Sequence, residues 1–381
     1  MSEETPEAPI HGVESLKLKR CRSVPIEDNS MGASLHDYVI SKIHPDIQNS
    51  SCSRVIVRTP YTRDPPAHIS RNEKKDKPFN WQRPTTIAID STTIQLNCFP
   101  GKDYVKHYAA LVATYYALEN RSLTTVQYSP PVAVECIEAF LSSNLSQMGH
   151  IDIVVVGYVH HLGLDDSWEG CPAESNNLFA WQKPKRTDGV SVSFLGCMVS
   201  FWGDISGHLV RALQVLNNVK CVLYIGKTGA LSPESEPNRW LATGDRSFLE
   251  GRLVEWENVL QRSVRISPRV HDGTHITVST LLCETEAWLN EWQPRCSWVD
   301  CEVGHMAQAS SEGRTAFAYL HIVSDNIAIQ NPQNLSNERL DEVVSNREHL
   351  FRDIRSILES FFASWPSHAS RPSLDGPTPI A

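Results

Sequence analysis

The chain has 381 residues, 41% of them hydrophobic, so it is long enough to bury one large core or two ordinary ones. Its 44 acidic and 35 basic residues give a formal charge of -9, which argues against a general surface for nucleic acid or for an anionic membrane. The polar, acidic start MSEETPEAPI lacks the basic and apolar runs of a secretory signal, and no apolar run is long enough for a membrane helix. The 10 cysteines are scattered without paired ligand spacing. We therefore expect a cytoplasmic protein, with a nuclear location left open, that has free thiols and no metal site.

The chain divides into three parts by composition. Residues 1–84 are rich in Ser, Pro, Asn and charge and show no usable hydrophobic period, which predicts a polar, largely disordered extension. Residues 85–365 carry regular patterns and are expected to form a single domain. Residues 366–381 are rich in proline and predict a flexible tail.

From Thr85 onward, strand patterns alternate with helix patterns. Strands are expected at 85–99, 123–129, 151–163, 190–196, 220–226, 275–282, 298–301 and 316–323, and helices at 103–120, 131–145, 204–218 and between Glu302 and Gly313. A turn is expected at 227–233, followed by a polar insertion through about Asn258. A last helix, with a capping box at Ser345 and Glu348, carries an apolar stripe. The alternation predicts an α/β fold of three layers, with a mainly parallel mixed central sheet flanked by helices.

Polar or glycine-bearing turns follow four of these strands, at Gly196, Gly226–Gly229, Asp300–Glu302 and Ser324–Asn326. Because the carboxyl ends of parallel strands meet at one edge of a sheet, we expect a ligand site there. The turn at 226–229 offers backbone N–H groups, a hydroxyl and an ammonium, which suit phosphate, carboxylate or sugar oxygens. It lacks the full spacing of a nucleotide triphosphate loop, and a plain turn is the alternative.

The acidic residues near this edge have two interpretations each. Asp300 and Glu302 alternate along an extended backbone, so one is expected to face the cleft and the other to meet a helix terminus. Asp325 follows an almost wholly apolar strand, where poor solvation would raise its pKa and let it hold a proton near neutrality. A helix-capping or turn-forming aspartate is the alternative.

Three blocks in this region resemble the nucleoside phosphorylase and nucleosidase superfamily, which includes purine and uridine phosphorylases. VLYIGKTGALSP is similar to the superfamily's strand and glycine turn, and WVDCEVGHMAQASSEGRTAFAYLHIVSDN to its acidic pair, small-residue helix and strand ending in Ser-Asp. VSVSFLG with DISGHLVRAL has the spacing of the preceding strand and helix. The resemblance covers residues 190–326 and implies a nucleoside phosphorylase-like domain.

The resemblance also implies roles for individual residues. Glu302 would hold the ribose hydroxyls, and Asp325, oriented by Ser324, would donate a proton to the departing purine. The turn from Gly226 through Lys227 and Thr228 to Gly229 would face phosphate or the attacking water. The remaining substrate-binding positions implied are Gly196, Cys301 and Asn326. The partner would be a nucleoside-like small molecule, with phosphate as a co-substrate of a phosphorylase, no further cofactor, and a homo-oligomer as the assembly.

Departures from the superfamily pattern leave alternatives open. Cys301 replaces the usual Met, Lys227-Thr228 replaces a pair of small residues, and Tyr224 stands where several phosphorylases carry a phosphate-binding arginine. The last change favours hydrolysis, although Lys227 could supply the missing charge. No residue can be assigned to stack on the base. An enzyme with altered chemistry on the same fold, or a non-catalytic nucleoside sensor that contacts partners through residues 1–84, remain the competing hypotheses.

Overall fold

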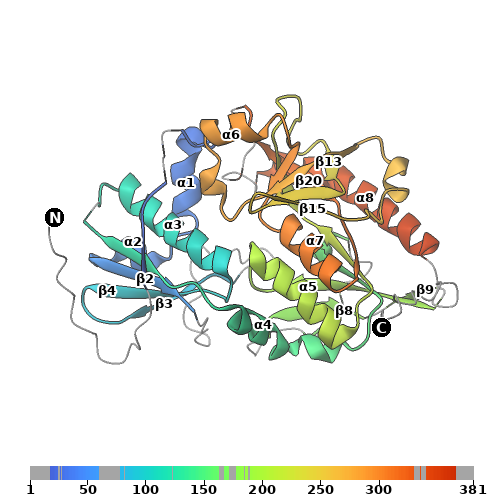
Figure 1. The fold of residues 1–381 in the computed structure, drawn as a ribbon, viewed down its shortest axis with the longest axis horizontal. Helices are drawn as coiled ribbons and strands as arrows, with labels where there is room; N and C mark the ends of the chain where they lie inside the picture. The colour runs from blue at the N-terminus through green and yellow to red at the C-terminus, as the bar shows by residue number, and fades with distance from the viewer. Residues whose placement is uncertain are drawn as a thin grey trace, which may run out of the picture.

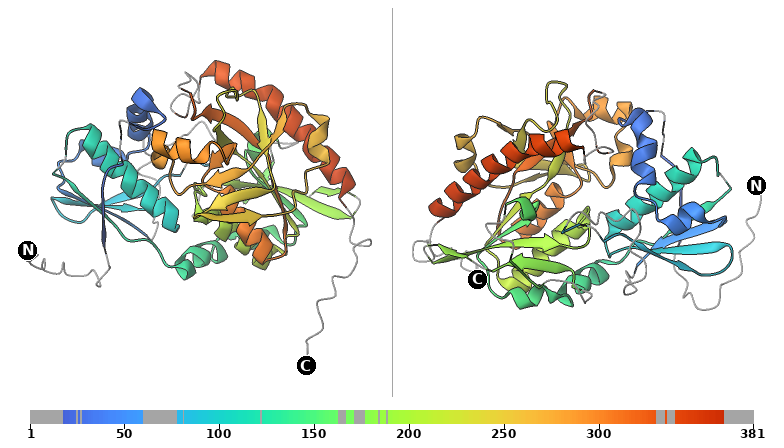
Figure 2. Two further views of the ribbon diagram at one scale, coloured as in Figure 1. Left: turned by 45° about the horizontal axis from the view of Figure 1, so that its top comes forward. Right: turned by 180° about the vertical axis from the view of Figure 1, so that it is seen from behind.

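The computed structural model describes residues 18–24, 26, 28–59, 78–80, 82–121, 123–162, 167–170, 177–183, 185–187, 189–329, 335 and 340–365. The tail predicted at 366–381 lies outside them. Two lobes lie side by side in Figure 1. The smaller lobe is built on a five-stranded sheet, and the larger lobe on a seven-stranded and an eight-stranded sheet. Figure 2 shows the same two lobes with the top tilted forward and from behind.

The sheet of the smaller lobe joins strands from both sides of the predicted boundary at residue 84. Its order is β1 (Lys19–Cys21), β5 (Thr125–Tyr128), β2 (Arg54–Arg58), β4 (Thr93–Asn97) and β3 (Thr85–Ala88). β2 lies in the middle and pairs in parallel with β4 and β5. The prediction of a disordered extension is therefore wrong for residues 28–59, and the predicted boundary cuts through one sheet.

Helices α1 (Leu35–Ile40) and α2 (Pro45–Asn49) explain why this segment folds. Apolar side chains of these helices and of the link between them are buried in the same core as α3 (Lys102–Leu118); they are Leu35, Val39, Ile43 and Ile47. This apolar set is small and surrounded by polar residues, so composition concealed it. The single strand predicted at 85–99 is likewise wrong: it is the hairpin of β3 and β4, turned where Asp90 Oδ1 accepts the Thr92 N–H at 2.7 Å.

The central sheet of the larger lobe confirms the predicted three-layer α/β class. Four strands are parallel, namely β19 (Ala316–Tyr319), β11 (Cys221–Ile225), β6 (Ile153–Gly157) and β10 (Val190–Cys197), and β8 (Phe179–Gln182), β7 (Trp168–Glu169) and β9 (Lys185–Thr187) add antiparallel pairs. Along β6, Val154 and Val156 enter one core, whereas Ile153 and Val155 enter another. The sheet is therefore buried on both faces.

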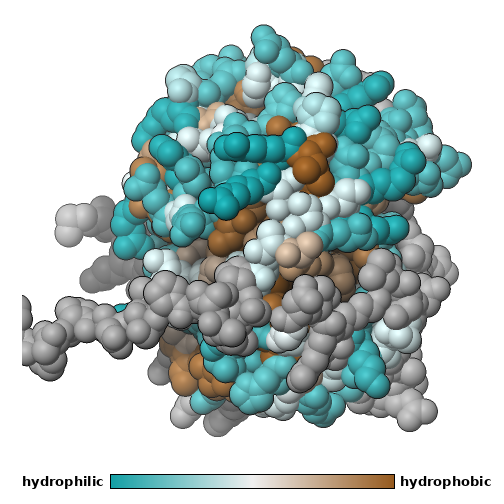
Figure 3. Space-filling view, turned by 90° about the vertical axis from the view of Figure 1, so that its right-hand side faces the viewer, coloured by the Kyte–Doolittle hydropathy of each residue, from teal (hydrophilic) through white to brown (hydrophobic). Residues whose placement is uncertain are grey.

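Helices cover the two faces of this sheet. On one side lie α4 (Ala133–Leu141), α5 (Asp204–Asn217) and α7 (Val303–Glu312). On the other lies α8 (Asp341–Ser364), which docks through Leu350, Ile354, Ile357 and Phe361 as its stripe predicts. α8 begins at Asp341, so the capping box predicted at Ser345 is wrong. Figure 3 shows the end of the larger lobe, where the coloured surface is mostly hydrophilic.

The third sheet continues two strands of the central one. β11 runs into β12 (Lys227–Ala230) across Gly226, and β19 runs into β20 (His321–Asn326) across Leu320. The full order is β15 (Arg252–Glu255), β14 (Arg246–Leu249), β17 (His275–Thr277), β18 (Trp298–Asp300), β12, β20, β13 (Leu241–Thr243) and β16 (Val270–Asp272). The expected turn after Gly226 is thus a strand, the polar insertion contains three strands, and the strand at 316–323 is two.

Within the described residues, the remaining helices are α6 (Glu286–Trp292) and five short 3-10 turns, at Gly32–Ser34, Asn144–Met148, Val159–His161, Ser263–Ile266 and Leu281–Cys283. None of the described helices is both long and apolar enough to cross a membrane.

Candidate functional site

A cavity of about 230 Å³ has walls from both lobes. The larger lobe contributes eight residues predicted from the sequence, which are Gly226, Lys227, Thr228, Gly229, Cys301, Glu302, Ser324 and Asp325. The smaller lobe contributes Tyr38, Lys42, Tyr104, His107 and Tyr108. The structure thus brings the two predicted catalytic acids to one cavity, beside the glycine turn.

Glu302 sits between the end of β18 and the start of α7. Its carboxylate accepts hydrogen bonds from the Tyr224 hydroxyl, at 3.3 Å, and from the N–H groups of Gly203 and Cys301. Burial nevertheless raises the pKa of this carboxyl to about 7. Gly203 has φ +61°, and a Cβ there would lie 2.5 Å from Cβ of Asp103, so the close approach of this N–H requires glycine.

Asp300 accepts hydrogen bonds from the start of helix α7, as expected for one member of the acidic pair. Its Oδ1 accepts the N–H groups of Glu302 at 3.0 Å and Val303 at 3.1 Å, which satisfies the first turn of α7. His275 Nε2 lies 3.3 Å from the same oxygen. Burial, followed by the charge of Glu302, raises the pKa of Asp300 well above its ordinary value.

Asp325 is held by its neighbour in the chain. The Ser324 hydroxyl lies 2.6 Å from Asp325 Oδ1 and 3.3 Å from the Thr228 carbonyl oxygen. A Cβ on Gly229 would lie 3.2 Å from Asp325 Oδ2, so the glycine leaves room for this carboxylate. The orientation of Asp325 by Ser324 that the resemblance implies fits this geometry.

Glu284 is a cavity residue that the sequence reasoning missed. It is only 5% exposed, and burial, followed by the charge of Asp325, raises its pKa well above the ordinary value. The Ser30 side chain hydrogen-bonds to it. The sequence did contain a signal for this residue, because Glu284 follows the predicted strand 275–282 just as the other candidates follow their predicted strands. Two carboxyl groups therefore lie near one another at one end of the cavity.

The glycine turn is packed more tightly than a free loop. A Cβ on Gly226 would lie 2.8 Å from Tyr224 Cζ and 2.9 Å from His321 Nε2. The Thr228 hydroxyl donates to the Val299 carbonyl at 2.8 Å, which joins β12 to β18. Lys227 and the backbone are the parts of this turn suited to an anionic or hydroxyl-bearing ligand.

Two predicted binding residues do not line the cavity. A Cβ on Gly196 would lie 2.2 Å from the ring of Phe79, so this glycine leaves room for that ring, and Phe79 itself lines the cavity. Asn326 donates to the carbonyl oxygens of Ser232 and Ser235, at 2.8 and 2.9 Å, and fixes the segment after β12. Both predictions are corrected to supporting roles.

Aromatic side chains supply flat surfaces in the walls of the cavity. Trp202 stacks on His107 of the smaller lobe, with ring centroids 4.2 Å apart and planes 19° apart, and its Nε1 donates to the Ser279 carbonyl. The Trp202 ring therefore forms part of the contact between the two lobes. Phe201 and Tyr158 also line the cavity and offer aromatic surface to a ligand.

Polar contacts hold the smaller lobe over the cavity. His305 Nε2 lies 2.9 Å from Asp103 Oδ2, and His107 Nδ1 lies 2.8 Å from the Thr280 hydroxyl. The Ser30 N–H donates to the Glu284 carbonyl at 2.8 Å. Residues from both lobes of the chain therefore line the cavity.

No protein-family model matches the chain. The curated protein "Oxidoreductase cns1" of Cordyceps militaris is 21% identical over 272 residues, which cover 64% of this chain and 34% of that protein. The chain thus spans about a third of the length of that relative.

Among solved structures, similar chains include a 5'-methylthioadenosine/S-adenosyl homocysteine nucleosidase of Campylobacter jejuni (14% identity, 55% of this chain, 99% of that chain, TM-score 0.44). Others are a futalosine hydrolase mutant of Helicobacter pylori (12%, 55%, 99%, 0.42) and a methylthioadenosine phosphorylase from an antarctic soil metagenomic library (15%, 57%, 88%, 0.42). These TM-scores are too low to carry an assignment. The sheets and helices themselves define an α/β protein with a carboxyl-lined cavity between two lobes.

Proposed function

We propose that the cavity cleaves the N-glycosidic bond of a purine nucleoside or a close analogue. The observation that carries the proposal is that Glu302, just after β18, and Asp325, near the end of β20, line one cavity beside the glycine turn. The sequence blocks that resemble the nucleoside phosphorylase and nucleosidase superfamily supply these same residues. We place the protein in that superfamily on this basis.

The two acids suit opposite ends of the breaking bond. The sugar develops positive charge in the transition state, which the Glu302 carboxylate would stabilise while it holds the ribose hydroxyls. The base departs with negative charge, which a proton from Asp325 would neutralise. Ser324 would keep Asp325 in place, and Glu284, whose pKa burial raises, would offer a second polar group at the base end.

Hydrolysis is favoured over phosphorolysis by the position of Tyr224. Its ring lies edge-on to Phe201 and His321, and its hydroxyl contacts Glu302, so this strand end presents a neutral group to the cavity. Phosphorolysis is the second candidate, because Lys227 lines the same cavity and could bind a phosphate ion. Water or phosphate would be the only co-reactant in either case.

A nucleoside panel assayed for free base, with and without phosphate, tests the proposal. Release without phosphate supports hydrolysis, and release that requires phosphate supports phosphorolysis. Asp325→Asn is the negative control for activity from contaminants, since it removes the proton donor and keeps the side-chain size. Binding without any base release would contradict the proposal and favour a sensor, and a changed nucleoside that keeps its base would favour altered chemistry.

A further inference from the structure

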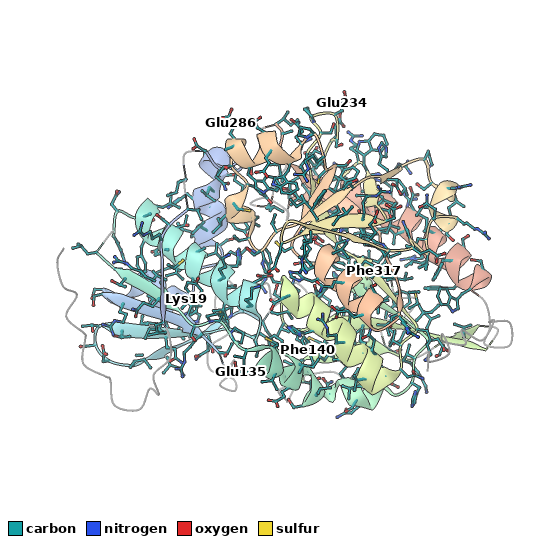
Figure 4. The ribbon with its side chains drawn as sticks, in the orientation of Figure 1. Lys19, Glu135, Phe140, Glu234, Glu286 and Phe317 are labelled. Carbon is teal, nitrogen blue, oxygen red and sulfur yellow. The ribbon has the colours of Figure 1, made fainter. Side chains whose placement is uncertain are left out.

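Three potential metal ligands meet outside the cavity, on two neighbouring helices of the larger lobe. Cys136 lies on α4, and Asp204 and His208 lie one turn apart on α5. A sulfur, a carboxylate oxygen and an imidazole nitrogen of these residues all lie within 4.8 Å of one another. Figure 1 shows α4 and α5 next to each other, and Figure 4 labels Glu135, which precedes Cys136 on α4.

The imidazole of His208 and the carboxylate of Asp204 offer lone pairs to a metal ion. Burial, followed by the charge of Arg211, lowers the pKa of His208 to about 4, so the imidazole is neutral at physiological pH. Its Nδ1 is buried and has no hydrogen-bond partner within the described part of the chain. Asp204 accepts the N–H groups of Lys102 at 2.9 Å and Asp103 at 3.0 Å, and its oxygens keep further lone pairs.

The charges around the three donors are balanced by other partners. The Lys102 ammonium lies 2.7 Å from Glu250, and the Arg211 guanidinium lies 2.7 Å from Glu312. These cations are thus neutralised by acids other than Asp204. A surface hollow of about 620 Å³ reaches Asp204 and His208 and gives an ion access from solvent.

We infer that Cys136, Asp204 and His208 bind a divalent transition metal of the zinc class. A thiolate, an imidazole and a carboxylate are the ligand types that zinc takes in proteins, and water would complete a tetrahedral set. Burial raises the pKa of the Cys136 thiol to about 12, so coordination replaces its proton, which leaves to solvent. The sequence expectation of no metal site rested on close Cys and His spacing, which ligands at 136, 204 and 208 do not show.

A bound ion would stabilise the backbone that holds Glu302 in the cavity. Asp204 follows Gly203, whose N–H binds the Glu302 carboxylate, and it also caps the first turn of α3. A metal on Asp204 would therefore fix both the start of α5 and the start of α3. The inference does not rest on the proposed nucleoside chemistry, because the three donors lie outside the cavity lining.

Cobalt titration of the chelator-treated full chain tests the site. We expect one equivalent of Co²⁺ to bind with a thiolate-to-cobalt charge-transfer band and intense tetrahedral d–d bands, and Zn²⁺ to displace it. Cys136→Ser should abolish the charge-transfer band, and His208→Ala should weaken binding by more than the roughly 10–100-fold typical of outer-shell partners. Cys21→Ser and His349→Ala, which alter the same residue types elsewhere, should bind as the wild type does.

A second measurement covers the case in which Cys136→Ser fails to fold. Zn²⁺ should raise the Tm of the wild type, and this rise should be lost in His208→Ala, whose side chain is partly exposed. A wild type that binds Co²⁺ without a charge-transfer band, or whose Tm does not respond to Zn²⁺, would overturn the inference. So would equal binding by His208→Ala and the wild type.

Discussion

Replacing Glu302 by glutamine should make the protein relatively more stable as the pH rises. The carboxyl has a pKa of about 7 in the folded chain against an ordinary 4.5, chiefly because burial disfavours its charged form. The unfolded chain therefore gains charge at a lower pH than the folded chain does. The free-energy cost of holding the charged carboxylate in the folded state is absent below the ordinary pKa. It grows as the pH rises from the ordinary pKa to the pKa of the folded chain, and it is constant above about pH 7.

The size of the effect follows from the two pKa values. One pH unit is worth about 1.4 kcal/mol, so the full cost is about 3.4 kcal/mol, and the part that develops between pH 5 and pH 8 is about 2.5 kcal/mol. Asp300 acts in the same direction, because its pKa is raised by burial and then by the charge of Glu302. Glutamine also loses one acceptor for an N–H group, which costs about 1–3 kcal/mol at every pH.

Urea unfolding of the wild type and Glu302→Gln at pH 5, 6, 7 and 8 measures this difference. The pH-independent loss of the acceptor shifts the whole curve, whereas the slope reports the buried charge of Glu302 and its effect on Asp300. We expect the free energy of unfolding of the variant, relative to the wild type, to rise by about 2.5 kcal/mol across the series. A difference that stays flat between pH 5 and pH 8 would refute the assignment of Glu302 as a buried, half-ionised carboxyl.

Three further substitutions test the cavity. Asp325→Asn should lower the rate of base release by about 10²–10⁴-fold with little change in Tm, and an unchanged rate would remove its role as proton donor. Gly226→Ala should cost about 1–3 kcal/mol of stability in thermal unfolding, because its Cβ would meet the ring of Tyr224, and a neutral result would show that this turn is loose. His107→Ala should lose the stack on Trp202 and about 2 kcal/mol of stability, and should raise the nucleoside KM; an unaltered KM would disconnect the smaller lobe from the site.

The larger lobe could be predicted well because its strands and helices carry clear periodicity. The central strands are short apolar runs, and α5 and α8 carry stripes at helical spacing that pack on opposite faces of one sheet. The continuation of a strand of the central sheet into a strand of the third sheet could not be predicted from the sequence. No turn residue marks the change at Leu320, and the register shift between Thr228 and Gly229 depends on pairing with distant β20.

The site was predictable where residues follow strands, and unpredictable where the second lobe supplies them. Glu302 and Asp325 lie at strand ends of the larger lobe, and both reach the cavity. Tyr38 and His107 lie on helices of the smaller lobe, and only the packing of the lobes brings them there. Asn326 was predicted to bind the ligand because it follows Asp325. Adjacent strand residues face opposite sides of the sheet, however, so the Asn326 side chain points away from the cavity and donates to a backbone carbonyl of another loop.

A comparison of two substrates with Asp325→Asn tests the central claim most directly. An ordinary purine departs as an anion unless it is protonated, whereas an N7-methylated purine departs as a neutral base without an acid. We predict that the variant cleaves the ordinary nucleoside about 10²–10⁴-fold more slowly than the wild type, and the N7-methylated nucleoside at nearly the wild-type rate. An equal loss of rate on both substrates, or no loss on either, would contradict the assignment of Asp325 as the acid that frees the base.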